Sequence, residues 1–407
     1  MPPRVRFPVT IPQLYCRSFR HYSSTGQPLP HNIALLPHRR LIALSGHDAS
    51  HFLQGLITQN VSRKVADTAP QAYYSAFLNA AGRVLHDTIL YQVHNDGGPE
   101  EASWFIEVDE QRASDLEKHL KRYKLRAKVQ IRLTAQEEFQ VAHAWRTESP
   151  AFPLRGYRSG GGGGREGGGD HGKLQWFRDP RTKRQGSGYG LDSSTAEEQA
   201  TYALPIIEDS TTTHVTANDY HIHRYLHGIP EGPLEIPPAQ ALPLESNMDL
   251  LNGIDFRKGC YVGQELTIRT KHTGVVRKRI LPVQLDASST TSEAEASASV
   301  SASVPGPSFD ASSSDFASRI PHGADIKAEG NGRRSIVGKW LAGVGNVGLA
   351  LCRLEPMVMG DGAAERVFWV EADGEGNGDG DGGASERRRH RVRAFVPSWM
   401  DLMDGKE

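Results

Sequence analysis

The pattern of apolar and polar positions in the first part of the chain is that of short strands alternating with helices. The apolar run at residues 41–44 predicts a strand, and from Asp48 onward apolar side chains recur at helical spacing. Residues 72–78 and 84–93 predict two further strands, and the turn-forming residues 79–82 between them predict a hairpin. The predicted helix places these apolar side chains on one face: Phe52, Leu53, Leu56 and Ile57.

The alternation continues toward residue 133. Residues 104–108 predict a strand, a helix follows from about Ser114, and alternating residues over 129–133 predict another strand. Because strands and helices succeed one another in this way, the pattern favours an α+β fold of sheets with packed helices. The apolar residues at helical spacing in the second helix are Leu116, Leu120 and Tyr123.

The last part of the chain has a different pattern. Short alternating strands with glycine punctuation predict a small C-terminal β-barrel. A helix predicted over residues 218–227, and ended by Gly228, precedes them. Cys352 lies inside one of the strands, where a small apolar thiol is expected to pack in the core. The predicted barrel strands cover residues 335–340, 347–353, 367–370 and 392–396.

Three segments of biased composition interrupt these patterns, at about residues 156–200, 286–318 and 373–390. Such Gly-rich and Ser-rich compositions bury too little apolar surface to fold, so we expect disordered insertions in surface loops. A small folded island is expected at residues 176–180 inside the first insertion. The basic run at 387–390 is compatible with a polyanion ligand, but a solvated charge run is the simpler interpretation.

The overall composition limits the functional classes. The chain of 407 residues has a formal net charge of -1, which gives no argument for a nucleic-acid partner. No apolar run approaches the roughly 20 residues that cross a bilayer, so no membrane insertion is expected. The cysteines, Cys16, Cys260 and Cys352, are too few and too scattered for a disulfide framework, which fits a reducing compartment.

The N-terminal residues favour import into mitochondria. No acidic residue precedes Asp48, whereas Arg, Ser and aromatic residues are frequent, and this is the composition of a mitochondrial transit peptide. Several prolines weaken the amphipathic-helix part of that pattern, and an ordinary disordered tail is the alternative. We expect residues 1–24 to form the transit peptide, with cleavage near Ser23.

The run of residues 257–265 is the strongest candidate for chemistry. It places Cys260 between Gly259 and Gly263, and both glycines allow backbone torsions that a side chain would forbid, which predicts a tight turn. Arg257 and Lys258 are close enough in sequence to favour the thiolate, the form of cysteine that attacks electrophiles and ligates metals. The alternative is a buried structural cysteine, because free cysteines are often small core residues.

The residues around this cysteine resemble a known family. Lys258-Gly259-Cys260-Tyr261 followed by Gly263-Gln264-Glu265 is similar to the hallmark of the folate-binding YgfZ group, within the superfamily of the glycine-cleavage aminomethyltransferase (T-protein, GcvT). The cysteine motif is highly specific, whereas the other matches are individually weak. They follow the family's order at residues 52–58, 79–83, 224–232, 242–249 and 253–256.

The resemblance implies both a fold and a function. It implies a folate-binding region over about residues 35–280, followed by a β-barrel over about residues 281–400. Mitochondrial members of the group are iron–sulfur cluster assembly factors, so we expect a matrix protein that matures 4Fe-4S enzymes such as aconitase and the lipoate and biotin synthases. The expected partners are ISCA-type (A-type) scaffold proteins.

The resemblance also implies roles for the residues of the cysteine motif. An iron–sulfur cluster needs four protein ligands, so Cys260 would share a 2Fe-2S cluster with the partner. Gln264 and Glu265 would brace the turn rather than touch a ligand. Whether any turnover occurs is left open, and an assembly factor on a transferase-like fold is the expectation.

Two carboxylates are carried over from the family as contacts of tetrahydrofolate. Glu245 matches a family glutamate, and a carboxylate can accept two of the hydrogen bonds that a pterin ring donates. Asp87 follows the hairpin turn where aminomethyltransferases carry two adjacent acidic residues. His86 replaces the first of them here, which argues against glycine-cleavage chemistry.

Other interpretations stay open. The main alternative is a tetrahydrofolate-dependent aminomethyltransferase of the glycine cleavage system, and a further one is an interaction protein whose Cys260 is structural. The histidines His221, His223 and His227 also suggest a metal site. No Cys or acidic ligand stands beside them at suitable spacing, so packing roles are favoured.

Overall fold

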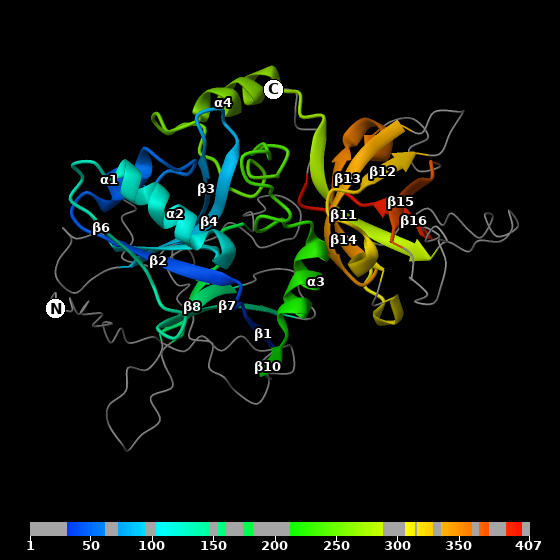
Figure 1. The fold of residues 1–407 in the computed structure, drawn as a ribbon, viewed down its shortest axis with the longest axis horizontal. Coiled ribbons are helices and arrows are strands. Elements are labelled where there is room, and N and C mark those ends of the chain that lie inside the picture. Colours follow the sequence, from blue (N-terminus) through cyan, green and yellow to red (C-terminus); the bar gives the residue numbers. More distant parts are fainter. Residues whose placement is uncertain are drawn as a thin grey trace, which may run out of the picture. The chain divides into compact units, whose positions relative to one another are not determined.

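The computed structural model divides into two compact units, which are described separately (Figure 1). One unit contains residues 1–217 and 251–264, and the other contains residues 218–250 and 265–407. The predicted transit peptide, residues 1–24, lies outside the described residues. The structure describes residues 31–61, 72–93, 103–146, 154–159, 174–181, 212–287, 306–313, 316–328, 335–359, 366–373 and 388–400.

The first unit contains a five-stranded sheet in the order β3-β4-β5-β2-β6. All neighbouring strands in it are antiparallel, and the predicted hairpin joins β3 to β4. The predictions of these strands are confirmed, and the burial of consecutive residues along β3, β4 and β5 shows that both faces of the sheet are covered. The strands are β2 (Arg39–Ser45), β3 (Ala72–Leu78), β4 (Val84–Val93), β5 (Ser103–Asp109) and β6 (Gln130–Leu133).

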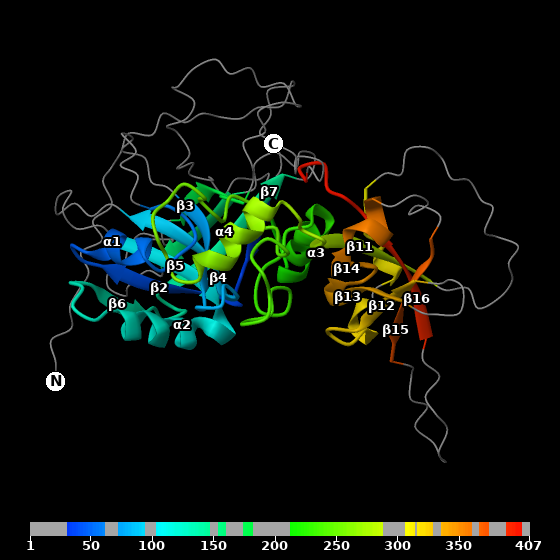
Figure 2. The ribbon, with the colours of Figure 1, turned by 90° about the horizontal axis from the view of Figure 1, so that it is seen from above.

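Two helices cover one face of this sheet, α1 (Ala49–Gln54) and α2 (Glu110–Tyr123). Figure 2 shows α2 lying along the sheet beside β6. α2 begins at Glu110, earlier than the predicted Ser114, because the Asp109 side chain caps it by accepting a hydrogen bond from the Gln111 N–H at 2.9 Å. The core between helices and sheet includes Phe52, Leu53, Ile57, Phe77, Leu90, Trp104, Ile106, Leu116 and Leu120.

A second five-stranded sheet lies on the other face and was not predicted. Its order is β10-β1-β7-β8-β9, with β10 and β1 parallel. The rings of Phe105 and Phe139 pack between the two sheets with centroids 4.8 Å apart, and those of Tyr91 and Phe177 with centroids 4.9 Å apart. The strands are β1 (His31–Leu35), β7 (Phe139–Arg146), β8 (Leu154–Ser159), β9 (Leu174–Arg178) and β10 (Thr212–Val215).

The second unit contains a closed barrel in the order β11-β14-β13-β12-β15-β16. It confirms the predicted C-terminal barrel, and Cys352 is buried in its core as predicted. Helix α3 (Ala217–His227) ends at Gly228, whose φ of 68° is in the left-handed region. The barrel strands are β11 (Lys278–Ala287), β12 (Asp325–Ala328), β13 (Ser335–Val344), β14 (Val347–Arg353), β15 (Phe368–Ala372) and β16 (Arg388–Ala394).

Parts of the three predicted insertions are ordered. β8 overlaps the start of the segment 156–200, β9 falls within it, and the predicted island at 176–180 overlaps β9. The second predicted insertion contains short 3-10 helices at Ala311–Ser313 and Ala317–Arg319. Residues 160–173, 182–200, 288–305, 314–315 and 374–387 of the three segments lie outside the described residues.

Two further elements complete the described chain. Helix α4 (Gln264–Thr273) follows the cysteine motif directly and was not predicted. A short π-helical turn spans Glu355–Met359 after β14. In the part of the chain that the structure describes, no helix is long and apolar enough to cross a membrane.

Candidate functional site around Cys260

The segment 251–263, here called the Cys260 loop, packs against the end of α1 and the residues that follow it. The Thr58 hydroxyl donates to the Gly253 carbonyl at 2.6 Å. The Asp255 N–H donates to the Thr58 carbonyl at 3.0 Å, and the Val262 N–H donates to the Gly55 carbonyl at 3.1 Å. These bonds join the Cys260 loop to residues 52–58, so two segments that resemble the family and lie far apart in the sequence are in direct contact.

Lys258 is the main anchor of the Cys260 loop. Its Nζ donates to the backbone carbonyls of Gln54, Ile57 and Gln59 at 2.8, 2.6 and 2.8 Å. It also lies 4.9 Å from the centroid of the Tyr261 ring, a cation–π contact. An ammonium group has three N–H donors, so the three carbonyls occupy all of them. None of these bonds goes to the Cys260 sulfur, and the expected effect of Lys258 on the thiolate stays a prediction.

Burial also affects the charge of this amine. It lowers the pKa of Lys258 to about 8, and the nearby Asp255 carboxylate partly opposes the shift.

The two glycines of the motif differ in their constraints. Gly263 has a φ of 79°, and a Cβ built on it would lie 2.3 Å from the Asn79 carbonyl oxygen and 2.9 Å from Leu78 Cβ. Only glycine therefore fits where the Cys260 loop meets the hairpin turn of β3 and β4. Gly259 is not in the left-handed region, and a Cβ there would meet nothing within 4 Å. The expectation that Gly259 supplies an unusual torsion is wrong.

Cys260 itself is exposed, in contrast to the buried Cys352. The next residue, Tyr261, is buried, and its N–H donates to Gln264 Oε1 at 3.2 Å. Glu265 lies in the first turn of α4, where a negative charge is favourable. The hydrogen bond of Gln264 and the position of Glu265 fit a bracing role. The arrangement presents one accessible thiol on an anchored loop.

Asp87 and His86 lie on opposite faces of β4, because successive side chains of a strand alternate. His86 is buried toward α2, and burial, together with Arg112 and His119 of that helix, lowers its pKa to about 3, so the ring is neutral. Asp87 faces the second sheet and lies 3.8 Å from Arg39 Nη1. His86 therefore does not complete an acidic pair beside Asp87.

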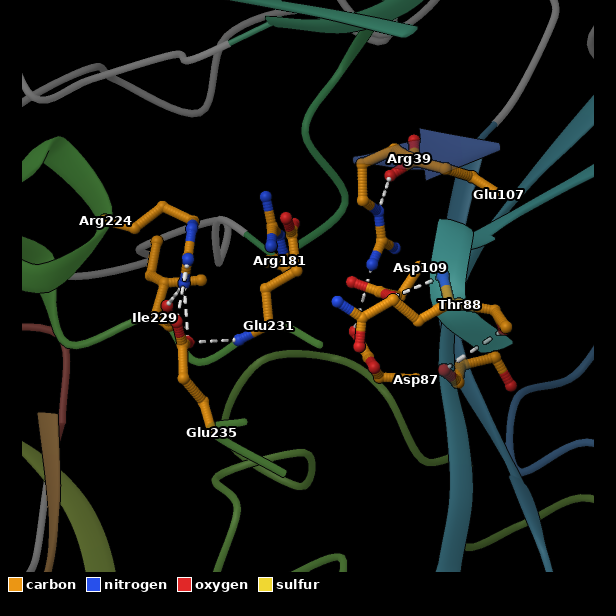
Figure 3. A network of polar contacts seen from close by, with 12 residues as sticks. Arg39, Asp87, Thr88, Glu107, Asp109, Arg181, Arg224, Ile229, Glu231 and Glu235 are labelled. Atoms are coloured by element: carbon orange, nitrogen blue, oxygen red, sulfur yellow. Dashed lines mark hydrogen bonds and ion pairs between the residues drawn. The ribbon is translucent and has the colours of Figure 1, made fainter. Parts of the chain in front are cut away.

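Asp87 adjoins a buried network that sequence reasoning missed. Arg39 Nε donates to Glu107 Oε1 at 2.7 Å (Figure 3), and the Tyr91 hydroxyl donates to Glu107 Oε2 at 2.5 Å. Arg155 of β8 donates to both oxygens of the same carboxylate. Burial and the Glu107 charge raise the pKa of Tyr91 well above its usual value. An acidic residue in the middle of the apolar run 104–108 was the available sequence signal.

Glu245 belongs to the second unit. Its backbone carbonyl accepts the Ile280 N–H at 2.9 Å, and its side chain, about a quarter exposed, lies 4.0 Å from Lys278 Nζ. Arg279 donates to both oxygens of Asp249 at 2.9 Å, which holds the 242–249 motif on β11. The roles of Asp87 and Glu245 as folate contacts stay predictions.

The histidines of α3 take part in packing and hydrogen bonding. The rings of His223 and His227 lie 4.5 Å apart, and His221 Nδ1 bonds Arg224 at 2.8 Å. Arg224 is buried and donates to both oxygens of Glu235 and to the Ile229 carbonyl (Figure 3). Over the described ranges, no group of three or more His, Cys, Asp or Glu side chains is placed to hold a metal ion.

The fold of the chain is of the aminomethyltransferase type. It is similar to the crystal structure of glycine cleavage system aminomethyltransferase T from Bartonella henselae, with a TM-score of 0.51 and 13% identity. The match covers 91% of this chain and 86% of that protein. Residues 277–402 match the family model of the CAF17 C-terminal β-barrel domain. The expected fold class is confirmed.

Whole-chain relatives define the family more narrowly. The iron–sulfur cluster assembly factor IBA57 homolog, mitochondrial, of Neurospora crassa is 41% identical over 94% of this chain and 84% of its own length. The homologues of Chaetomium globosum and Aspergillus oryzae are 38% and 39% identical over 98% and 93% of this chain, and 90% and 83% of their own lengths. The chain belongs to the IBA57 family of mitochondrial iron–sulfur cluster assembly factors. The predicted family and mitochondrial location are confirmed, and glycine cleavage is not favoured.

Proposed function

We propose that this protein matures 4Fe-4S proteins in the mitochondrial matrix, with Cys260 supplying one ligand to a 2Fe-2S cluster that an ISCA-type scaffold also holds. The cluster is cargo in this proposal. The observation that carries it is the exposed thiol on a loop anchored by Lys258. Aconitase and the lipoate and biotin synthases are the expected beneficiaries.

The geometry supports a shared ligand. A 2Fe-2S cluster needs four protein ligands, mostly thiolates, and Cys260 provides one. Cys352, the other cysteine in the described part of the chain, is buried in the barrel, and burial raises the pKa of its thiol to about 12. A ligand offered to a second protein must be accessible yet fixed in position, and the anchored Cys260 loop meets both conditions.

Complex formation with an ISCA-type scaffold tests this function. Wild-type protein mixed with the scaffold and a 2Fe-2S source should form a heteromeric complex with visible absorption, whereas the protein alone should stay colourless. Cys260→Ser should abolish the coloured complex at equal folded content by circular dichroism. Cys352→Ala, the matched control, should leave it intact.

The same variants should be compared in cells. In a deletion strain, Cys260→Ser should fail to restore aconitase activity and Cys352→Ala should restore it. If Cys260→Ser assembles the complex and restores aconitase as well as the wild type does, the thiol is not a cluster ligand. The interaction-protein interpretation would then replace this one.

We also propose that the protein binds tetrahydrofolate, with Asp87 and Glu245 as candidate contacts in their respective units. The aminomethyltransferase-type fold supports this, and so does the burial of Asp87 beside a charged network. The His86 side chain faces α2 and not the side of β4 on which Asp87 lies, so Asp87 has no second acidic group beside it on β4. This supports ligand binding without aminomethyl transfer.

A further inference from the structure

The C-terminal end of α2 and the turn after it concentrate positive charge. No acidic residue occurs from 118 to 136. On the helix, Lys118, Lys121 and Arg122 lie on the face opposite the buried Leu116 and Leu120. We call the following residues the basic tip of α2: Lys118, Lys121, Arg122, Tyr123, Lys124, Leu125, Arg126 and Lys128.

An apolar residue stands at the centre of the basic tip. Leu125 is 88% exposed, the highest exposure among the large apolar residues that the structure describes. Its φ of 43° is in the left-handed region, at the position after the helix where Gly or Asn avoids the steric cost. Tyr123, 38% exposed, contacts His119 with the two rings tilted and their centroids 4.7 Å apart. In the protein without a partner, Leu125 therefore has a sterically unfavourable backbone conformation and an apolar side chain exposed to water.

Helix stabilisation does not account for the whole cluster. Basic residues in the last turn favour the helix dipole, which covers Lys121 and Arg122. Arg126 and Lys128 lie beyond the helix. Nearby carboxylates are already engaged: Glu117 with Lys121 at 2.9 Å, and Asp48 with His47 and the Lys128 N–H. Among the described residues, Arg122, Lys124 and Arg126 form no ion pair.

We propose that the basic tip of α2 docks the protein on an anionic phospholipid surface. Each Lys or Arg near such a surface adds attraction to the headgroups, and an exposed aliphatic side chain can enter the boundary between headgroups and acyl chains. Tyr123 has the amphipathic ring that suits this interface. Docking is peripheral, since it needs only the helix end.

Two other kinds of anionic partner, single-stranded nucleic acid and an acidic protein, fit the basic tip of α2 less well. Single-stranded nucleic acid is bound mainly by stacking bases on aromatic rings, whereas the residue most exposed here is a leucine. A stable protein interface buries roughly 800 Å² on each side around an apolar centre, and one leucine with a partly exposed tyrosine provides little of that apolar surface.

Vesicle co-sedimentation of the full chain tests the proposal. The protein should partition to phosphatidylcholine vesicles that contain cardiolipin, and much less to phosphatidylcholine alone, with binding weakened by salt. Arg126→Gln should lower the partition coefficient about fivefold, which corresponds to about 1 kcal/mol for one basic residue. Leu125→Asn suits the left-handed backbone, so it should keep the fold and also weaken binding. Arg391→Gln, an exposed arginine of β16, is the control.

The outcomes separate the possible partners. Selective binding that Arg126→Gln and Leu125→Asn reduce, and Arg391→Gln does not, supports the proposal. Absent binding, equal binding to neutral vesicles, or equal loss in the control overturns it. Tighter binding to homopolymeric RNA that Arg126→Gln weakens would reassign the basic tip to nucleic acid.

Discussion

At the scale of single residues, Cys260 is held by neighbours whose partners lie far away in the chain. Lys258 bonds carbonyls that are 204, 201 and 199 positions away from it. The sequence indicated Cys260 as a functional residue, because Lys258, Gly259 and Gly263 stand close to it in the chain. It could not predict the bracing role of Lys258, because no local pattern shows carbonyls exposed at the end of α1.

The two glycines of the motif should respond differently to substitution. Gly263→Ala should lower the free energy of unfolding by at least about 1–2 kcal/mol, because the left-handed φ is unfavourable for Ala and its Cβ would overlap the Asn79 carbonyl. Gly259→Ala should stay within about 0.5 kcal/mol of wild type, since nothing lies near the added methyl group. Urea unfolding of both variants measures this, and equal losses would contradict the geometry.

Lys258 should give the stability a specific pH dependence. Its folded-state pKa of about 8 is below the usual 10.5, so the unfolded chain binds this proton more tightly. Stability therefore rises as the pH passes from about 8 toward 10.5 and the buried amine becomes neutral. Lys258→Met has no titrating amine at this position, so it lacks this rise. In urea titrations, the unfolding free energy of the wild type minus that of Lys258→Met should therefore increase from pH 7.5 to pH 9.5. A difference that shrinks over this range would show that the pKa is not lowered.

At the scale of elements, local pattern and long-range pairing account for different parts of the fold. β2 to β5 were predicted because each contains a short local run of apolar residues and turn-forming residues lie between β3 and β4. The second sheet was missed because its strands pair across long distances: His31 pairs with Thr212, in parallel. β8, with the sequence LRGYRS, also lacks the alternation that marks a strand.

The buried carboxylate of Glu107 links elements of the two sheets and should be sensitive to neutralisation. Glu107→Gln removes the negative charge of the carboxylate to which Arg39 and Arg155 both donate, and breaking such a buried pair typically costs about 3–5 kcal/mol. The expected result is a large fall in the urea midpoint with an unchanged slope. Glu137→Gln, at an exposed position, is the control and should change stability little. A small effect of Glu107→Gln would mean that the network reorganises at low cost.

At the scale of the whole molecule, the chain passes between its two units more than once. Residues 218–250 belong with the barrel, and the Cys260 loop returns to the first unit. The resemblance to the folate-binding family predicted consecutive regions with a boundary near residue 280, because sequence motifs report only their order along the chain. The Cys260 loop is held in the first unit by hydrogen bonds such as that from Thr58 to Gly253, which only the folded structure shows.

Ligand binding to the native molecule as a whole provides the test of the folate proposal. A ligand that binds only the folded state raises its stability, by about 2.7 kcal/mol at a concentration 100 times the Kd. Tetrahydrofolate should therefore raise the melting temperature of the wild type. Asp87→Asn and Glu245→Gln, measured separately, should each reduce that rise, whereas Asp115→Asn on α2 and Glu355→Gln after β14 should not. Each variant needs its own melting temperature without ligand, because Asp87 lies beside Arg39 and its loss also changes the stability of the free protein. An equal rise in all five proteins would place the ligand away from both carboxylates, and no rise in the wild type would remove folate from the proposed function.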